Sequence, residues 1–389
     1  MDMHHPHSTE GFAPASVPPR RALVLSGGIA LGAFEAGAYA AYEAAEGDAP
    51  PWVLGASAGA LNAAIIAGNA PGQRLPMLRR FWEAAATEPM PVAGALFGPP
   101  PAFGPWRRGY NQLSAARTLL LGNPALFRPR LMPEIGPAPS FYELGPLLRR
   151  LPEFVDFDRL NGGEVRLTVT ATDVETGERV VFDTGEGARI GPEHLAASSA
   201  LLPLFAPVEV EGRLLADGGL STNAPLDIVL DAPGAGPLHC LVVELFARSG
   251  RRPASLSAAL ARAGDLAFGS QTRQALEGRV REYRMRALVG RLAAELPPER
   301  EREAELASLL AHAEATVALL NYHAAEDEAG AGKAFDFSRA TLADRWAAGE
   351  RGMAEALERL ARPEAARVLA PGLLLHEVEA RSTPAGQRR

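Results

Sequence analysis

The sequence has almost no cysteine and no segment long enough to cross a membrane. Among 389 residues there is one cysteine, Cys240, so an internal disulfide is excluded and a cytoplasmic location is favoured. No apolar run approaches the roughly 18 uncharged residues that a spanning helix needs, although peripheral contact with a membrane stays open. Because there is no cysteine pair, no H-E-x-x-H motif and no calcium loop, we expect no metal and no cofactor.

Blocks of basic residues are also missing. The chain carries 39 Lys and Arg against 46 Asp and Glu, a net charge of −7, which argues against a nucleic-acid partner. The first twenty residues lack the apolar segment of a signal peptide and predict a disordered tail, which holds His4, His5 and His7. Nothing in the sequence indicates the oligomeric state.

The residues that are present predict an α/β protein. Hydrophobic residues make up 47% and charged residues 22%, and short apolar runs alternate with helices rich in small residues up to about residue 246. Residues 251–325 are rich in Ala, Arg, Glu and Leu and predict amphipathic helices, one of them resuming at Glu299. A further helix is expected to begin near Ser338 or Thr341. The expected strands are 22–25, 52–54, 165–171, 180–182, 208–210 and 238–245.

Residues 89–139 interrupt the alternation with eleven prolines. Loops of this length inside a domain are uncommon and often functional. The segment also holds aromatic side chains such as Trp106 and the apolar run 118–121. Two interpretations have equal weight: an apolar cap over a pocket, or an ordered surface insertion without substrate contact.

A glycine turn at residues 26–32 follows the first expected strand and precedes a helix. Such a turn points free backbone N–H groups at an anion. Its spacing matches neither G-x-G-x-x-G nor the P-loop, which argues against a nucleotide.

A second strand–turn–helix contains Gly55-Ala56-Ser57-Ala58-Gly59. This G-x-S-x-G pattern is typical of a nucleophile elbow, in which small neighbours let a tight turn expose the serine hydroxyl. The following helix directs its N-terminal N–H groups at the reacting oxygen.

A nucleophilic serine needs a base, and no histidine stands in a suitable turn. Asp217 is the better candidate, because it ends an expected strand and precedes Gly218-Gly219, which permit close approach to a neighbouring loop. The histidines outside the tail are His194, His239, His312, His323 and His376.

Together the three segments resemble the patatin-like phospholipase family over about residues 21–231. The resemblance implies a three-layer fold with a mostly parallel central sheet, and a Ser–Asp dyad that hydrolyses acyl esters of lipids through an acyl-enzyme. By position, Ser57 would be the nucleophile, Asp217 its activator, and the N–H groups of Gly27, Gly28 and Ile29 the oxyanion hole. The glycines that would support these motifs are Gly32, Gly55, Gly59, Gly218 and Gly219.

The resemblance also implies a domain organisation. Residues 1–20 would be the tail, 21–247 the catalytic domain with its insertion at 89–139, 248–380 a mainly helical C-terminal region, and 381–389 a frayed tail.

The first turn departs from the family pattern G-G-G-x-R-G at two positions, Ile29 and Leu31. Backbone donors need neither side chain, but isoleucine favours a negative φ, so a turn that requires positive φ would be distorted. Two alternatives therefore remain. One is an α/β-hydrolase triad of Ser57, Asp217 and His323; the other is a catalytically weak or inactive protein that binds lipid or a partner.

Overall fold

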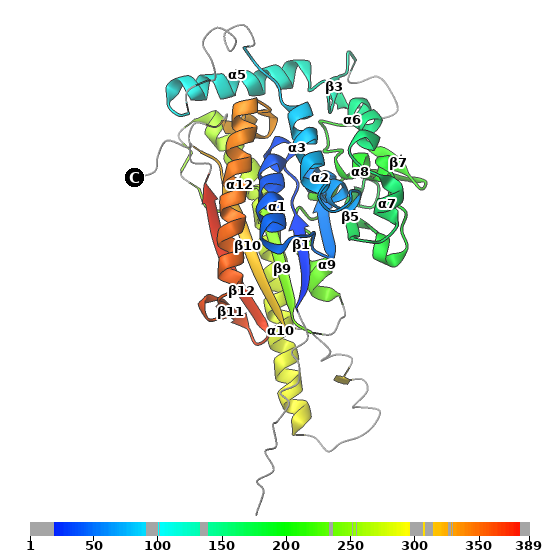
Figure 1. Ribbon diagram of the computed structural model, residues 1–389, viewed down its shortest axis with the longest axis vertical. Helices are drawn as coiled ribbons and strands as arrows, with labels where there is room; N and C mark the ends of the chain where they lie inside the picture. The colour runs from blue at the N-terminus through cyan, green and yellow to red at the C-terminus, as the bar shows by residue number, and fades with distance from the viewer. Residues whose placement is uncertain are drawn as a thin grey trace, which may run out of the picture.

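A ten-stranded sheet forms the centre of the molecule (Figure 1). The structure is a computed structural model that describes residues 19–90, 100, 102–132, 139–232, 236–250, 252–253, 255–295, 306–307, 314–325, 328 and 330–381. The strands are β1 (Arg20–Leu25), β2 (Trp52–Ala56), β5 (Arg166–Asp173), β6 (Arg179–Asp183), β7 (Val208–Val210), β8 (Arg213–Asp217), β9 (Leu238–Glu244), β10 (Ala315–His323), β11 (Arg367–Ala370) and β12 (Leu373–Arg381). All six strands expected from the sequence are confirmed.

The strand order is β11-β12-β10-β9-β1-β2-β5-β8-β7, with β6 also paired to β5. The run from β12 to β5 is parallel, and β11, β6, β8 and β7 are antiparallel to their neighbours. The expected mostly parallel sheet is therefore confirmed.

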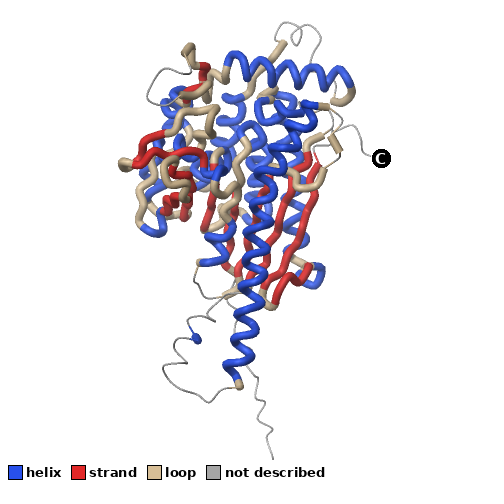
Figure 2. The backbone as a smooth tube through the Cα atoms, turned by 180° about the vertical axis from the view of Figure 1, so that it is seen from behind, coloured by secondary structure: helices blue, strands red, loops and turns tan. Residues whose placement is uncertain are grey.

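Helices cover both faces of the sheet, as the residues of β1 require. Leu23 and Leu25 pack into one core with α1 and α2, whereas Ala22 and Val24 pack into a second core with α9 and α10. Figure 1 shows α1 and α12 in front of the sheet, and Figure 2 shows α10 behind it. The α-helices are α1 (Gly32–Glu46), α2 (Ala58–Ala67), α3 (Arg74–Ala85), α5 (Pro105–Leu121), α6 (Gly145–Arg150), α7 (Phe157–Asn161), α8 (Pro192–Ser198), α9 (Leu226–Asp231), α10 (Leu256–Ala294) and α12 (Arg339–Leu360).

The C-terminal region combines long helices with strands of the same sheet. Ser338 caps α12 by accepting a hydrogen bond from the Thr341 N–H, as expected. The helix expected from Glu299 onward is wrong for residues 315–323, which form β10 between β9 and β12. Their run of buried apolar residues fits a central parallel strand as well as a helix, so periodicity alone misassigns it. The boundary predicted at residue 247 stays a prediction.

The proline-rich insertion contains a helix of 17 residues, α5, and the strand β3 (Arg128–Pro129), which forms a short hairpin with β4 (Tyr142–Glu143) just after the insertion. A proline at the start of α5 ends the preceding loop without disturbing the helix. Residues 91–99, 101 and 133–138 of the insertion, and residues 1–18 and 382–389 of the expected tails, lie outside the described residues. No helix among the described residues is long and apolar enough to cross a membrane.

Candidate active site

Strand β5 brings the serine and the aspartate together. Its consecutive residues Thr170 and Ala171 pair with Ala56 at the end of β2 and with Asp217 at the end of β8. Ser57 directly follows Ala56, so both side chains emerge at the same edge of the sheet. Two residues 160 positions apart thus become neighbours through one strand that runs between them.

The turn at Ser57 has the conformation of a nucleophile elbow. Ser57 has φ 54° and ψ −123°, a conformation disfavoured for a residue with a side chain, and α2 begins at the next residue. Gly55 and Gly59 are in close contact, since a Cβ on Gly55 would lie 2.3 Å from the Gly59 carbonyl carbon. The Ser57 N–H donates to Ser198 Oγ at 3.0 Å, which fixes the turn from α8.

Asp217 is buried, and its carboxyl group lines the same cavity as Ser57. One of its oxygens accepts the Gly219 N–H at 2.7 Å, so the carboxyl is held by the glycine turn that follows it. Burial away from water raises the pKa of Asp217 to about 7, and the Ser57 side chain and the Gly219 N–H oppose that rise. The carboxyl group is therefore suited to accept a proton near neutral pH.

The first glycine turn lies against this pair. A Cβ on Gly27 would be 3.0 Å from Ser57 Cβ, so the close approach depends on glycine. The Gly27 N–H, however, is donated to Asn223, to Oδ1 at 3.1 Å and to the carbonyl oxygen at 3.2 Å. Asn223 therefore occupies the Gly27 N–H in this geometry, and the role of Gly27 as an oxyanion donor stays a prediction.

The N–H groups of Gly28 and Ile29 have no hydrogen-bond partner among the described residues. Ile29 has φ +52°, so the turn keeps the left-handed backbone at a β-branched residue instead of moving to negative φ. Leu31, where the family pattern has arginine, is fully buried.

Two cavities meet at Ser57 and Ile29. One, of about 160 Å³, holds the dyad and is lined by side chains from the sheet edge, from α10 and from the 3-10 helix η5 (Gly330–Phe335); they include Leu201, Leu204, Phe246, Leu260, Phe268 and Phe335. The other is a narrow apolar cavity of about 40 Å³, lined among others by Leu61, Phe81, Trp82, Leu126, Phe127 and Leu147. Lys333 also lines the first cavity, but its ammonium group forms an ion pair with Asp265, so an uncharged, chain-like group fits these mostly apolar surroundings best.

Residues that the sequence did not single out hold the turn in place. The Asn223 amide donates to the Gly27 carbonyl oxygen at 3.3 Å and lies 3.5 Å from a carboxylate oxygen of Glu244. Glu244 is buried and has a pKa raised by burial to about 7. The sequence could have indicated this buried carboxyl group, because Glu244 stands inside the apolar run 238–246.

Arg345 of α12 is a second support, and it is fully buried. Its guanidinium donates to the carbonyl oxygen of Ala30, inside the first turn, at 3.0 Å, and it forms an ion pair with Glu328 at 2.7 Å. The C-terminal region thus contacts the candidate oxyanion turn directly.

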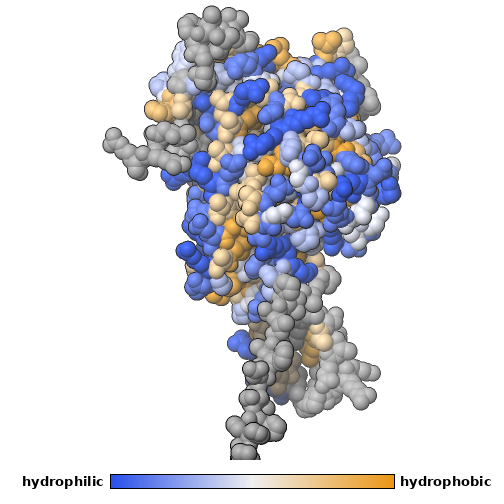
Figure 3. All heavy atoms as spheres, in the orientation of Figure 1, coloured by the Kyte–Doolittle hydropathy of each residue, from blue (hydrophilic) through white to orange (hydrophobic). Residues whose placement is uncertain are grey.

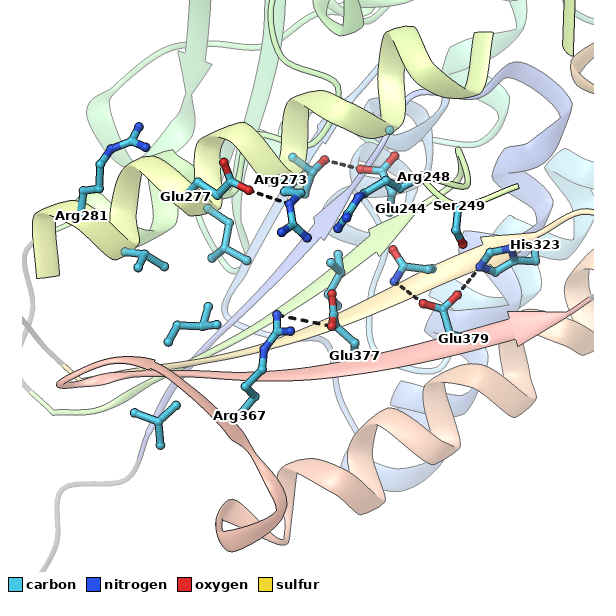
Figure 4. Close-up of a pocket in the computed structure, with 18 of the residues that line it drawn as sticks. Glu244, Arg248, Ser249, Arg273, Glu277, Arg281, His323, Arg367, Glu377 and Glu379 are labelled. Carbon is cyan, nitrogen blue, oxygen red and sulfur yellow. Dashed lines mark hydrogen bonds and ion pairs between the residues drawn. The ribbon is translucent and has the colours of Figure 1, made fainter. Parts of the chain in front are cut away.

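His323 is not part of this site. It ends β10 in a separate cleft of about 650 Å³ between α10 and the sheet, where it pairs with Glu379 (Figure 4). The same cleft holds the ion pairs Arg273–Glu277 and Arg367–Glu377. Among the described residues, no group of three or more His, Cys, Asp or Glu side chains could hold a metal ion.

Comparison with known families agrees with the motifs. The family described as patatin-like phospholipase matches residues 23–230, which is more than half of the chain. The chain belongs to the patatin-like phospholipase family. A second family, described as patatin phospholipase, matches residues 266–367. The C-terminal region of this patatin-like protein therefore also resembles a known family of patatin phospholipases.

Solved structures that resemble this patatin-like protein are distant. VipD from Legionella pneumophila is 15% identical over 88% of this chain and 68% of its own, with a TM-score of 0.39. The type III effector protein ExoU is 14% identical over 88% of this chain and 54% of its own, with a TM-score of 0.31. A complex of ExoU with SpcU from Pseudomonas aeruginosa gives 18% identity, 92% and 74% coverage and a TM-score of 0.29. Values this low transfer no function.

Proposed function

We propose that this protein is a serine esterase that cleaves carboxylic esters of lipids through a dyad of Ser57 and Asp217. The observation that carries the proposal is that the elbow serine and a buried aspartate line the same cavity, and that Ser57 also borders a second, apolar cavity. Membership of the patatin-like phospholipase family supports a lipid as the substrate class.

The reaction proceeds in two steps. Asp217 accepts the Ser57 proton while Oγ bonds to the ester carbonyl carbon, and the proton then passes to the departing alcohol as the C–O bond breaks. Asp217 next takes a proton from water, the hydroxide adds to the acyl-enzyme, and Ser57 recovers its proton as the fatty acid leaves. A pKa near 7 suits a group that must accept and return a proton in each half-reaction.

The tetrahedral intermediate carries its negative charge on the former carbonyl oxygen. We assign the N–H groups of Gly28 and Ile29 as its donors, because they are unpaired and lie in the turn beside Ser57. The N-terminal end of α2 adds a favourable dipole at the same place. Leu31 is compatible with this assignment, since no side chain is needed.

A lipid-binding protein without turnover is the second candidate. The conformation of Ile29 favours it, because a β-branched residue at positive φ marks a turn under strain. The position of Asp217 in the same cavity as Ser57 favours catalysis instead, since binding alone needs no proton acceptor.

The deciding experiment is pre-steady-state hydrolysis of a chromogenic medium-chain ester. Wild type is expected to release a burst equal to the enzyme concentration, Ser57→Ala to show none, and Asp217→Asn to lose most of the rate, by about 10³-fold or more. Labelling with a fluorophosphonate reports the activated serine independently.

His323→Gln is the matched control, since it separates the dyad from a Ser–Asp–His triad. It is expected to keep the wild-type burst, because His323 lies in another cleft. Wild-type turnover by Ser57→Ala contradicts the proposal, and normal folding with neither burst nor labelling in wild type favours the binding protein.

A further inference from the structure

Helix α5 carries its hydrophobic residues on the side that faces solvent. Its buried face includes Arg107, Asn111 and Thr118, whereas Trp106, Leu113 and Leu120, spaced seven apart, are 65%, 46% and 75% exposed. Gly109 and Ala116 complete the exposed strip between them. A surface helix of a globular protein normally has the opposite arrangement. An exposed apolar face of this kind is typical of a surface that binds a partner or a membrane.

The segment that carries the strip has basic residues but no acidic ones, and acidic neighbours pair with two of its arginines, Arg107 and Arg128. Residues 102–132 contain five arginines and no Asp, Glu or Lys, in a chain whose net charge is −7. Arg108 and Arg117 are exposed and lie on either side of the strip. Arginines that flank an apolar strip can place their guanidinium groups at the level of lipid phosphates.

A second apolar group lies beside the C-terminal end of α5. Leu131 and Met132, which follow β3, and Phe141, which precedes β4, are 100%, 63% and 54% exposed, and these three side chains are called the hairpin tip below. The Tyr142 hydroxyl donates to the Leu119 carbonyl oxygen and so ties the hairpin to the end of α5. Figure 3 shows hydrophobic side chains, in orange, projecting at the end of the molecule where α5 lies in Figure 1.

We propose that this protein docks on an anionic phospholipid bilayer through the α5 face, defined as the strip of Trp106, Leu113 and Leu120, its flanking arginines and the hairpin tip. The chain that leaves α5 supplies Leu126 and Phe127 to the narrow cavity beside Ser57, so docking here brings the bilayer to the element that lines the site. The inference goes beyond the proposed function, because binding needs no turnover.

The binding experiment uses the full chain with Ser57→Ala, which prevents hydrolysis of the probe. Trp106 is the exposed residue among four tryptophans, since Trp52, Trp82 and Trp346 are buried, so emission reports on this face. Vesicles of phosphatidylcholine with phosphatidylglycerol are expected to shift Trp106 emission to the blue and to sediment the protein. Brominated lipids are expected to quench it.

The α5 variant is Leu113→Gln with Leu120→Gln, which keeps the reporter. The loss of two large apolar contacts is expected to lower partitioning at least about tenfold. The matched control is Leu288→Gln with Leu292→Gln on α10, where the side chains are 48% and 54% exposed, and less than about a twofold change is expected. Arg108→Gln with Arg117→Gln is expected to weaken binding about tenfold to anionic vesicles and little to pure phosphatidylcholine.

Three outcomes overturn the proposal. They are unchanged partitioning of the α5 variant, an equal loss in the α10 control, or a lipid-free dimer that the α5 variant converts to monomer. The last result assigns the face to a second copy of the chain. If the wild-type protein binds vesicles but does not hydrolyse esters, the docking proposal stands and the proposed function fails.

Discussion

Two turns meet at the candidate active site and share one design. Each follows a parallel strand, β1 or β2, and leads into a helix. Each also has glycines close by and one non-glycine residue, Ile29 or Ser57, at positive φ. Ile29 at +52° and Ser57 at +54° therefore share a positive φ. The turns differ in what holds them in place.

The elbow is stabilised largely by its own small residues and by neighbouring strands. Gly55 packs on Gly59, Gly59 packs on the Leu25 carbonyl of β1, and Ser198 binds the Ser57 N–H. The first turn is held instead by residues much further along the chain. Ser26 Oγ accepts the Leu245 N–H, Asn223 binds Gly27, and Arg345 binds Ala30. The C-terminal region is therefore a structural part of the candidate oxyanion site.

Of the remote residues that support the first turn, Arg345 is expected to give the largest effect when it is replaced. Arg345→Met leaves Glu328 buried without its partner and removes the donor to Ala30, so a loss of about 3–5 kcal/mol in unfolding free energy is expected. The double variant with Glu328→Gln is expected to recover part of that stability but not the ester turnover, because Ala30 still lacks its donor. Urea unfolding and kcat measured on the same samples check both expectations.

Arg74→Met is the control for the Arg345 variants. Arg74 is as buried as Arg345 and forms ion pairs with Asp48 and Glu164, but it contacts neither turn. It is expected to lose stability while keeping its turnover per folded molecule. Equal losses of kcat in Arg74→Met and in the double variant would assign Arg345 to stability alone.

Asn223→Ala tests the second remote support. The variant removes one acceptor from the Gly27 N–H and a donor from the buried Glu244 carboxyl, so kcat is expected to fall about 10- to 100-fold. Asn161 joins Phe157 and Ile190 in a similar way, distant from the dyad. Asn161→Ala should therefore affect the melting temperature without changing kcat, and the opposite pattern contradicts the support role of Asn223.

The pH dependence of ester hydrolysis and of stability tests the role of Asp217, the proposed base for the elbow serine. Because the base form of Asp217 exists above its pKa of about 7, kcat/KM is expected to rise about tenfold per pH unit below pH 7 and then level off. Protonated Asp217 is favoured in the folded state, so its contribution to stability is present below pH 4 and is lost as the pH rises to 7. This decline amounts to about 2–3 kcal/mol between pH 5 and pH 8, and Asp217→Asn should remove it, as measured by unfolding at both pH values.

The elbow could be predicted from sequence because its determinants are local. Small residues at 55, 56, 58 and 59, a strand before them and a helix after them are enough to indicate the turn. Asp217 could also be predicted from the sequence, since D-G-G after an apolar strand is a local pattern. Its position next to Ser57, however, depends on β5 lying between β2 and β8.

The first turn was only partly predictable because its partners are remote. Its glycines indicated backbone donors, but the loss of the Gly27 N–H depends on Asn223, 196 residues away, and no local pattern reveals that contact. Arg345 lies in an amphipathic helix where a buried arginine gives no signal distinct from a surface one. The Gly27 hydrogen bond and the burial of Arg345 both depend on tertiary contacts, as does the formation of a strand instead of a helix at β10.

The smallest expected effect is at Ile29, and it tests the positive φ that Ile29 shares with Ser57. If Ile29 is left-handed, Ile29→Gly should be more stable than Ile29→Ala by about 1 kcal/mol, because glycine has no Cβ that clashes there. The adjacent Ala30 is not at positive φ, so Ala30→Gly should lose about 0.5–1 kcal/mol instead. Both Ile29 variants are expected to keep their ester turnover, since the N–H group remains. Greater stability of Ile29→Ala, measured by urea unfolding, would show that Ile29 does not have the positive φ of Ser57.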